Sequence, residues 1–313
     1  MGAVATDVTT DAVRAGLRGR GRDVRGAVFA GLMLASLLAS LAILVVLLWD
    51  VAKVGVPVLA DRGTSFFTDT NSTVPSRAGI GQALVGSMVL MVIVAVVAFP
   101  IGIGAAVYLE EYARDTWLTR FITANIRNLA GVPSIVYGIL GLVIFVEALS
   151  KIVTMWPTGS LLSGGLTLAV LVLPIVIITS SEALRAVPRG IREAAYGVGA
   201  TRWEVIRSHV LPSAIPGIVT GTVVSLARAF GETAPLLLVG AAQGFINTGS
   251  GSPLHKLLNA PYTAMPRIIL DWMTRPQKAF TELAAAAIVV MMVILLVVNG
   301  FAIWLRNRYE RKW

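Results

Sequence analysis

Long runs of apolar residues alternate with shorter polar segments along most of the chain. Six such runs are found, at 27–49, 83–109, 128–149, 164–184, 213–242 and 283–305. A helix needs about 20 mainly apolar residues to cross the hydrocarbon core of a bilayer. The pattern therefore predicts an all-α integral membrane protein with six transmembrane helices.

We expect the first run to be retained as a transmembrane helix and not to be removed as a leader. Residues 27–49 carry no charge, exceed the usual apolar core of a signal peptide, and are followed by no convincing cleavage site. The sequence therefore divides into a flexible basic cytoplasmic tail at 1–26, a transmembrane domain at 27–305 and a basic cytoplasmic end at 306–313.

Composition and charge agree with a membrane protein. Hydrophobic residues make up 56% of the 313 residues and charged ones 14%, whereas a soluble domain carries roughly 25% charged residues. The net charge of +9 is distributed among the ends of the apolar runs instead of one patch. Basic loops stay in the cytoplasm, and 17 Lys and Arg lie on the same side as both termini against 8 on the other. Both termini are therefore expected to be cytoplasmic.

Proline and glycine interrupt several of the runs. Broken helices are tolerated at membrane depth where they line a cavity inside the protein, and the GxxxG spacing allows two helices to approach closely. The residues concerned are Pro100, Gly102, Gly104, Gly131, Pro133, Gly138, Pro174, Gly231 and Pro235, with the GxxxG pair at Gly217 and Gly221. That pair is equally compatible with a specific helix contact and with the general abundance of glycine in membrane helices.

The polar segment 185–212 has the pattern of a helix–turn–helix. Pro188 and Pro212 bound it, and Gly197 and Gly199 divide it into two potential helices. Small residues in the first helix would let another protein approach its backbone. The alternative is an amphipathic loop that lies on lipid without a protein partner.

This segment resembles the EAA loop of ABC-importer permeases. The residues that match are Glu193, Ala194, Ala195, Gly199, Leu211 and Pro212. The resemblance implies a coupling helix that docks in a groove of a cytoplasmic ATPase. His209 departs from the pattern, because the family usually has an aliphatic residue there.

Two opposite charges lie inside the fifth run. Arg228 follows Ser213 by fifteen residues, which is about 22 Å along a helix and close to mid-membrane. A charge at that depth costs roughly 2.5–3.5 kcal/mol on insertion scales. Arg228 and Glu232 are four residues apart, so they would share a helix face. They form either a structural ion pair or an anion site, in which the planar guanidinium binds an oxyanion and Glu232 competes with it.

The same segment, from Arg228 to Pro235, resembles the fifth-span motif of the phosphate-specific ABC transporter's permeases, in which the matching Arg and Glu are implicated in phosphate passage. The segment Gly131–Gly138 also resembles that subfamily. Pro261–Pro266, followed by Asp271 and Trp272, is more similar to the PstA type of subunit than to its sister PstC. The resemblance covers about residues 27–305.

Motifs for other chemistry are missing from the sequence. No GxxxxGK[ST] loop is present, so no cofactor is expected on this chain and ATP would bind the partner ATPase. No cysteine is available for disulfides or thiolate metal sites. The two histidines, His209 and His255, have no cluster of metal ligands around them. Adjacent Glu110 and Glu111 are interpreted as a solvated helix end.

These features predict a type I ABC-importer transmembrane domain that imports inorganic phosphate by alternating access and is not itself an enzyme. The implied partners are a second permease, a cytoplasmic ATPase dimer, an extracytoplasmic phosphate-binding protein and membrane lipid, without nucleic acid. PstC, or a permease for sulfate, molybdate or phosphonate, remains the alternative. A membrane enzyme would need clustered carboxylates or a metal site, and a sensor would not explain a buried Arg/Glu pair.

Overall fold

The computed structural model describes residues 24–152, 159–241 and 262–309. Most of the tail predicted at 1–26, residues 310–313 of the basic end, and Pro261 and His255 lie outside them. Within the described ranges, six helical segments are long and apolar enough to cross a membrane: Val24–Arg62, Gly81–Tyr112, Ser134–Ile152, Leu161–Arg185, Arg202–Gly231 and Lys278–Arg308. The predicted six spans are confirmed, with shifted ends.

The first helix, α2 (Val24–Arg62), is longer than the predicted run and crosses a boundary between two structural units. In the unit that ends at Lys53, every described side chain from Val24 to Asp50 is exposed. In the unit that begins at Val54, Gly55 packs against α15 (Lys278–Tyr309), where an added Cβ would lie 2.7 Å from the backbone of Ala285.

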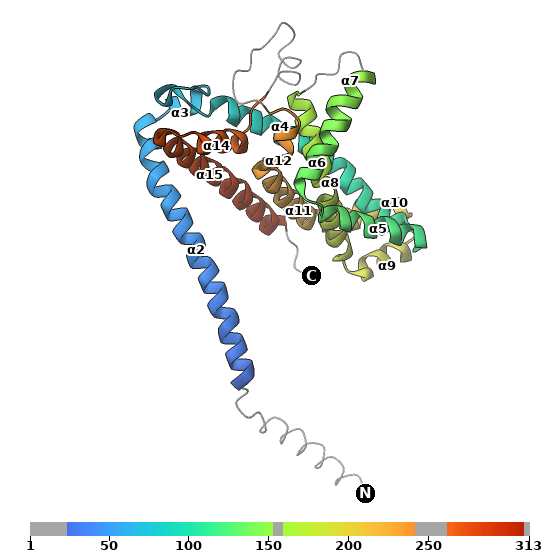
Figure 1. Ribbon diagram of the computed structural model, residues 1–313. Helices are drawn as coiled ribbons and strands as arrows, with labels where there is room; N and C mark the ends of the chain where they lie inside the picture. Colours follow the sequence, from blue (N-terminus) through green and yellow to red (C-terminus); the bar gives the residue numbers. More distant parts are fainter. Residues whose placement is uncertain (1–23, 153–158, 242–261, 310–313) are drawn as a thin grey trace. The chain divides into compact units, whose positions relative to one another are not determined.

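The most buried span of the second unit is α8 (Leu161–Arg185), which packs against α4 (Gly81–Val107) and α11 (Leu211–Gly231) (Figure 1). Glycines make these contacts close. An added Cβ at Gly102 of α4 would lie 2.6 Å from Val176, and one at Gly165 of α8 would lie 2.6 Å from Ile93. Close packing of this kind holds helices together in lipid, which provides no hydrophobic force between them.

The GxxxG pair forms a specific contact within the chain. Gly217 faces Ala183 of α8, where an added Cβ would approach the alanine Cβ to 2.8 Å, and Gly221 faces Thr179 one turn away. The two glycines are therefore the α11 side of its interface with α8.

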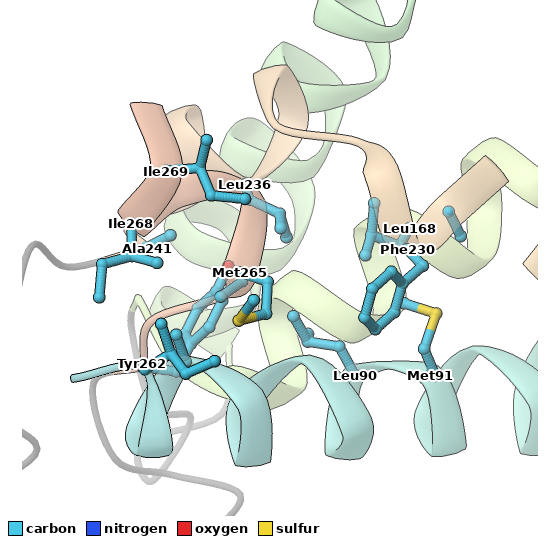
Figure 2. Packing of buried hydrophobic residues seen from close by; sticks show 14 of the residues in the cluster. Leu90, Met91, Leu168, Phe230, Leu236, Ala241, Tyr262, Met265, Ile268 and Ile269 are labelled. Atoms are coloured by element: carbon cyan, nitrogen blue, oxygen red, sulfur yellow. The ribbon is translucent and has the colours of Figure 1, made fainter. Parts of the chain in front are cut away.

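Side chains from several helices meet in the main core. Leu90 and Met91 of α4, Phe230 of α11, Leu168 of α8 and Met265 of α14 (Met265–Thr274) belong to one buried cluster (Figure 2). The segment that precedes α14 is held by the same core. Ser87 of α4 accepts a hydrogen bond from the Met265 amide at 2.8 Å, and Tyr262 packs on Gly164 of α8. The segment leading into α14 is thereby anchored to both α4 and α8.

The polar segment 50–82 contains helices in addition to the end of α2. These are α3 (Ser65–Thr68) and the 3₁₀ turn η1 (Pro75–Arg77). The Trp272 indole of α14 donates to the Asn71 side chain at 3.0 Å, and Arg275 donates to the Ser72 carbonyl at 3.2 Å. The two segments between spans, distant in sequence, are thereby joined.

The third run is divided differently from the prediction. Its first residues end a separate helix, α5 (Trp117–Ala130), and the span itself comprises α6 (Ser134–Gly141), the π-helical segment η3 (Leu142–Ala148) and α7 (Leu149–Ile152). Gly131 and Pro133 separate the two, because proline disfavours a helical conformation in the residue before it.

On α5 the exposed rings of Trp117 and Phe121 stack, with centroids 5.6 Å apart, as in a helix that lies on a membrane surface.

We predict that Gly221→Ala destabilises the protein by about 1–3 kcal/mol, because overpacking forces helices apart. The measurement is the midpoint of thermal unfolding in detergent. The matched control is Gly104→Ala, since Gly104 is exposed on α4 and has no atom within 4 Å of an added Cβ. Equal midpoints for the two variants would contradict the close α8–α11 interface.

Candidate substrate path and coupling loop

The fifth span breaks at the charge pair. The helix α11 ends at Gly231, Glu232 has extended backbone angles (φ −76°, ψ 122°), and the short helix α12 (Ala234–Leu238) follows. The break lies where the sequence predicts an interruption of the fifth run, at Gly231 and Pro235. Pro235 has no amide to donate to the Gly231 carbonyl, and its ring would collide with that carbonyl in a continuous helix.

Arg228 and Glu232 nevertheless remain together. The Arg228 Nε lies 3.6 Å from the Glu232 Oε1, which is an ion pair without a hydrogen bond between these atoms. The Arg228 side chain is 52% exposed and that of Glu232 17%. Among the residues that the structure describes, the guanidinium makes no hydrogen bond. Half of the side chain is exposed, so its donors are accessible to a ligand.

The local electrostatics favour a cation that binds anions weakly. Arg228 lies in the last turn of α11, where the negative end of the helix dipole stabilises positive charge. Glu232 adds a carboxylate at the same point. An oxyanion that approaches the guanidinium gains bidentate contacts but meets these two negative groups, so the arrangement can hold an anion briefly and release it.

The predicted helix–turn–helix at 185–212 is present. Its first helix is α9 (Arg189–Gly197), and the turn contains Gly199 with φ +84°. Thr201 and Glu204 then form a capping box that starts α10 (Arg202–Val205). The second arm differs from expectation, because α10 continues through the π-helical η4 (Ile206–Val210) into α11 without a break. Pro212 lies inside this continuous helix, just after the π-helical η4, instead of closing a loop.

The residues of the EAA pattern divide into an outer and an inner set. Glu193, Ala194, Gly199 and Pro212 are exposed, and Leu211 is half-buried. Ala195 is buried in a small core, which also includes Ala106, Leu184, Val187, Val205, Val210, Ala214 and Ile218. One face of α9 is thus fixed on the bundle while Glu193 and Ala194 project from it. Their role in docking stays a prediction.

Glu110 and Glu111 are not a solvated helix end, contrary to expectation. They lie in the π-helical segment η2 (Tyr108–Tyr112) that ends the second span, and both are ion-paired at 2.7 Å. The partners are Arg185 for Glu110 and Arg192 for Glu111. The sequence carried a signal for this contact, because the orientation rule already assigned the acidic pair and these arginines to the same side of the membrane.

The described residues include no group of three or more His, Asp or Glu that could hold a metal ion. The described residues contain six candidate membrane spans, a helix–turn–helix between the fourth and fifth of them, and a charge pair at the break of the fifth. The chain belongs to the family of binding-protein-dependent transport system inner membrane components, whose model matches residues 98–311. It is therefore a multi-pass membrane protein of the permease class.

Individual relatives agree with this family. The chain is 34% identical to "Phosphate transport system permease protein PstA 1" of Mycobacterium tuberculosis, over 82% of this chain and 81% of that protein. It is 36% identical to "Probable ABC transporter permease protein YqgI" of Bacillus subtilis, a match that spans 55% of this chain and only 56% of YqgI. In fold it is similar to a chain of a bacterial alginate ABC transporter crystallised with its periplasmic protein (TM-score 0.63, 16% identity, 93% of this chain and 99% of that chain).

We predict that Gly199→Ala opens the loop between α9 and α10. A side chain at positive φ costs about 1–2 kcal/mol, which raises the opened fraction about five- to thirtyfold. Tryptic cleavage of the loop in membranes should accelerate accordingly. Gly197→Ala is the control, because Gly197 is helical, lacks a positive φ and has open space around it. Identical cleavage rates for the two variants would exclude strain at this turn.

Proposed function

We propose that this chain is the PstA-type permease subunit of an ATP-driven importer of inorganic phosphate. The observation that carries the proposal is the loosely paired Arg228 at the break of the fifth span. Its half-exposed guanidinium suits a tetrahedral oxyanion, and Glu232 lies within 3.6 Å to compete for it. The 34% identity to a phosphate permease over most of both chains supports the substrate.

A complete importer would contain further subunits. Because the Arg228 side chain is half-exposed on its own chain, a second permease would enclose the path in a heterodimer. An extracytoplasmic binding protein would deliver phosphate, as a periplasmic protein is bound to the alginate importer similar in fold. A cytoplasmic ATPase dimer would bind ATP and engage α9 through Glu193 and Ala194, which project from the bundle.

The mechanism would be alternating access. Closure of the ATPases on ATP pulls the coupling loop, and the two permeases rotate so that the path around Arg228 opens to the other side. The backbone break at Gly231–Glu232 gives the fifth span a bending point beside the bound anion. Hydrolysis then resets the loop, and Glu232 recaptures Arg228 as phosphate leaves.

The alternative candidates differ in substrate or in subunit type. A sulfate, molybdate or phosphonate permease would share the EAA loop, and a PstC subunit would share the phosphate path. The segment around Arg228 and Glu232 argues for phosphate. The residues before α14, which pack Tyr262 on Gly164, belong to the motif that favours PstA over PstC.

Uptake by the reconstituted complex tests the substrate and the role of Arg228. Radiolabelled phosphate should be imported and should outcompete sulfate strongly. Arg228→Gln should abolish uptake at normal membrane abundance, and Arg228→Lys should restore little, because a lysine keeps the charge but not the bidentate fork. Arg120→Gln is a matched control, since Arg120 is an exposed arginine paired with Asp115 at 3.1 Å on the surface helix α5. Equal import of sulfate, or wild-type uptake by Arg228→Gln, would refute the proposal.

Glu232→Gln separates two roles of the carboxylate. If Glu232 releases phosphate by competing for Arg228, the variant should insert normally but transport slowly. A structural partner would instead leave a buried charge unpaired and lower abundance. The 52% exposure of Arg228 leads us to expect the first outcome. Abundance and initial uptake rate are measured side by side, and a loss of abundance equal to the loss of uptake would contradict the competitor role.

A further inference from the structure

A buried ion pair connects the coupling loop to the end of the second span. Glu111 of η2 is 8% exposed, and its Oε1 accepts hydrogen bonds from Arg192 of α9, at 2.7 Å from Nη2 and 3.3 Å from Nε. The two residues are 81 positions apart in the sequence. The contact is therefore a tertiary link between α9 and the helix that continues α4.

The Arg192 guanidinium also binds backbone carbonyls at the C-terminal end of α8. Arg192 donates to the Leu184 carbonyl at 2.9 Å and to the Val187 carbonyl at 2.8 Å, where α8 ends. Carbonyls in the last turn of a helix have no partner within that helix. Arg192 therefore joins three elements at one point: α9 itself, the C-terminal end of α8 and the end of α4.

The second helix of the coupling loop, α10, also contacts η2, the π-helical turn that contains Glu111. The Arg202 guanidinium of α10 lies 5.1 Å from the centroid of the Tyr112 ring in η2. Below these contacts, Ala195 of α9 and Val205 of α10 pack with Ala106 of α4 in the small buried core. The end of α4 is thus held between both helices of the coupling loop.

We propose that Glu111 and Arg192 are positioning residues that transmit displacement of α9 to α4 during transport. The inference rests on the proposed function, because it assumes that an ATPase moves α9. When α9 moves, the apolar contacts can slide, whereas a guanidinium with directional hydrogen bonds to a buried carboxylate keeps its register. The second span then follows the loop together with α8, to which it is packed through Gly102 and Gly165.

The neighbouring pair supplies a matched control. Glu110 and Arg185 are also 2.7 Å apart, but Arg185 is 53% exposed and ends α8, so this ion pair joins η2 to α8 and includes no residue of α9. Loss of Glu110 removes one charge from the same turn without disconnecting the loop. Any effect specific to transmission should therefore appear at Glu111 and be absent at Glu110.

The test measures phosphate delivered per ATP hydrolysed by the complete complex in proteoliposomes. Glu111→Gln and Arg192→Lys should each lower this ratio about fivefold or more, while Glu110→Gln should keep the wild-type ratio. The double variant Glu111→Gln/Arg192→Lys should be no worse than the more severe single variant, because both remove one link. A purely structural role would lower abundance, uptake and ATP hydrolysis together and leave the ratio unchanged.

An unchanged ratio in both single variants, or an equal fall in Glu110→Gln, would overturn the link. Should Glu111→Gln fail to accumulate, Glu111→Asp keeps the buried charge with a shorter reach, and its ratio should fall between wild type and Arg192→Lys. A wild-type ratio for Glu111→Asp at normal abundance would also overturn it. The proposed function fails separately, if the wild-type complex hydrolyses ATP without importing phosphate.

Discussion

The close approach of α8 to its neighbours determines how the rest of the bundle is arranged. Lipid supplies no hydrophobic force between helices. The helices are instead held together by van der Waals contact, which small residues increase because they allow a close approach. Three glycines of neighbouring helices each pack against a side chain of α8. Gly102 of α4 packs against Val176, Gly221 of α11 against Thr179, and Gly141 of α6 against Thr167. An added Cβ at any of these glycines would overlap atoms of α8. Because α8 is fixed on three sides, both of its ends are fixed too.

The fixed ends explain where the polar features lie. At the coupling-loop end, the carbonyls of Leu184 and Val187 present an acceptor pair that Arg192 fills. In the fifth span, α11 is anchored to α8 through Gly217 and Gly221, and Arg228 follows two turns after that contact. The part of α11 that bears the charge is therefore held in position, while the break after Gly231 leaves the following residues able to bend.

The parts of the fold that the sequence predicted correctly depend on local patterns. The six spans follow from apolar length, and the helix–turn–helix follows from Gly199, which occupies the positive φ that glycine allows. Contacts across long separations could not be predicted in this way. Hydropathy alone does not show the backbone break after Gly231, which Gly231 and Pro235 indicate instead, and it treats α5 as a polar connection. The partner of Glu111 is 81 residues away, so no local pattern identifies it.

Two of the Arg–Glu pairs among the described residues differ in geometry, and the difference bears on the proposed anion site. The Arg192 guanidinium lies 2.7 Å from a carboxylate that is 8% exposed, and it also donates to two backbone carbonyls. Its donors are therefore occupied, and no ligand can enter without breaking several hydrogen bonds. Arg228 is 3.6 Å from a carboxylate and half-exposed, so its donors are open to an oxyanion. Separating Arg192 from Glu111 would leave a buried charge without a partner, which costs free energy. In the proposed anion site, the second pair would lose little when an anion takes the place of Glu232, which is the property that transient binding in a transport path requires.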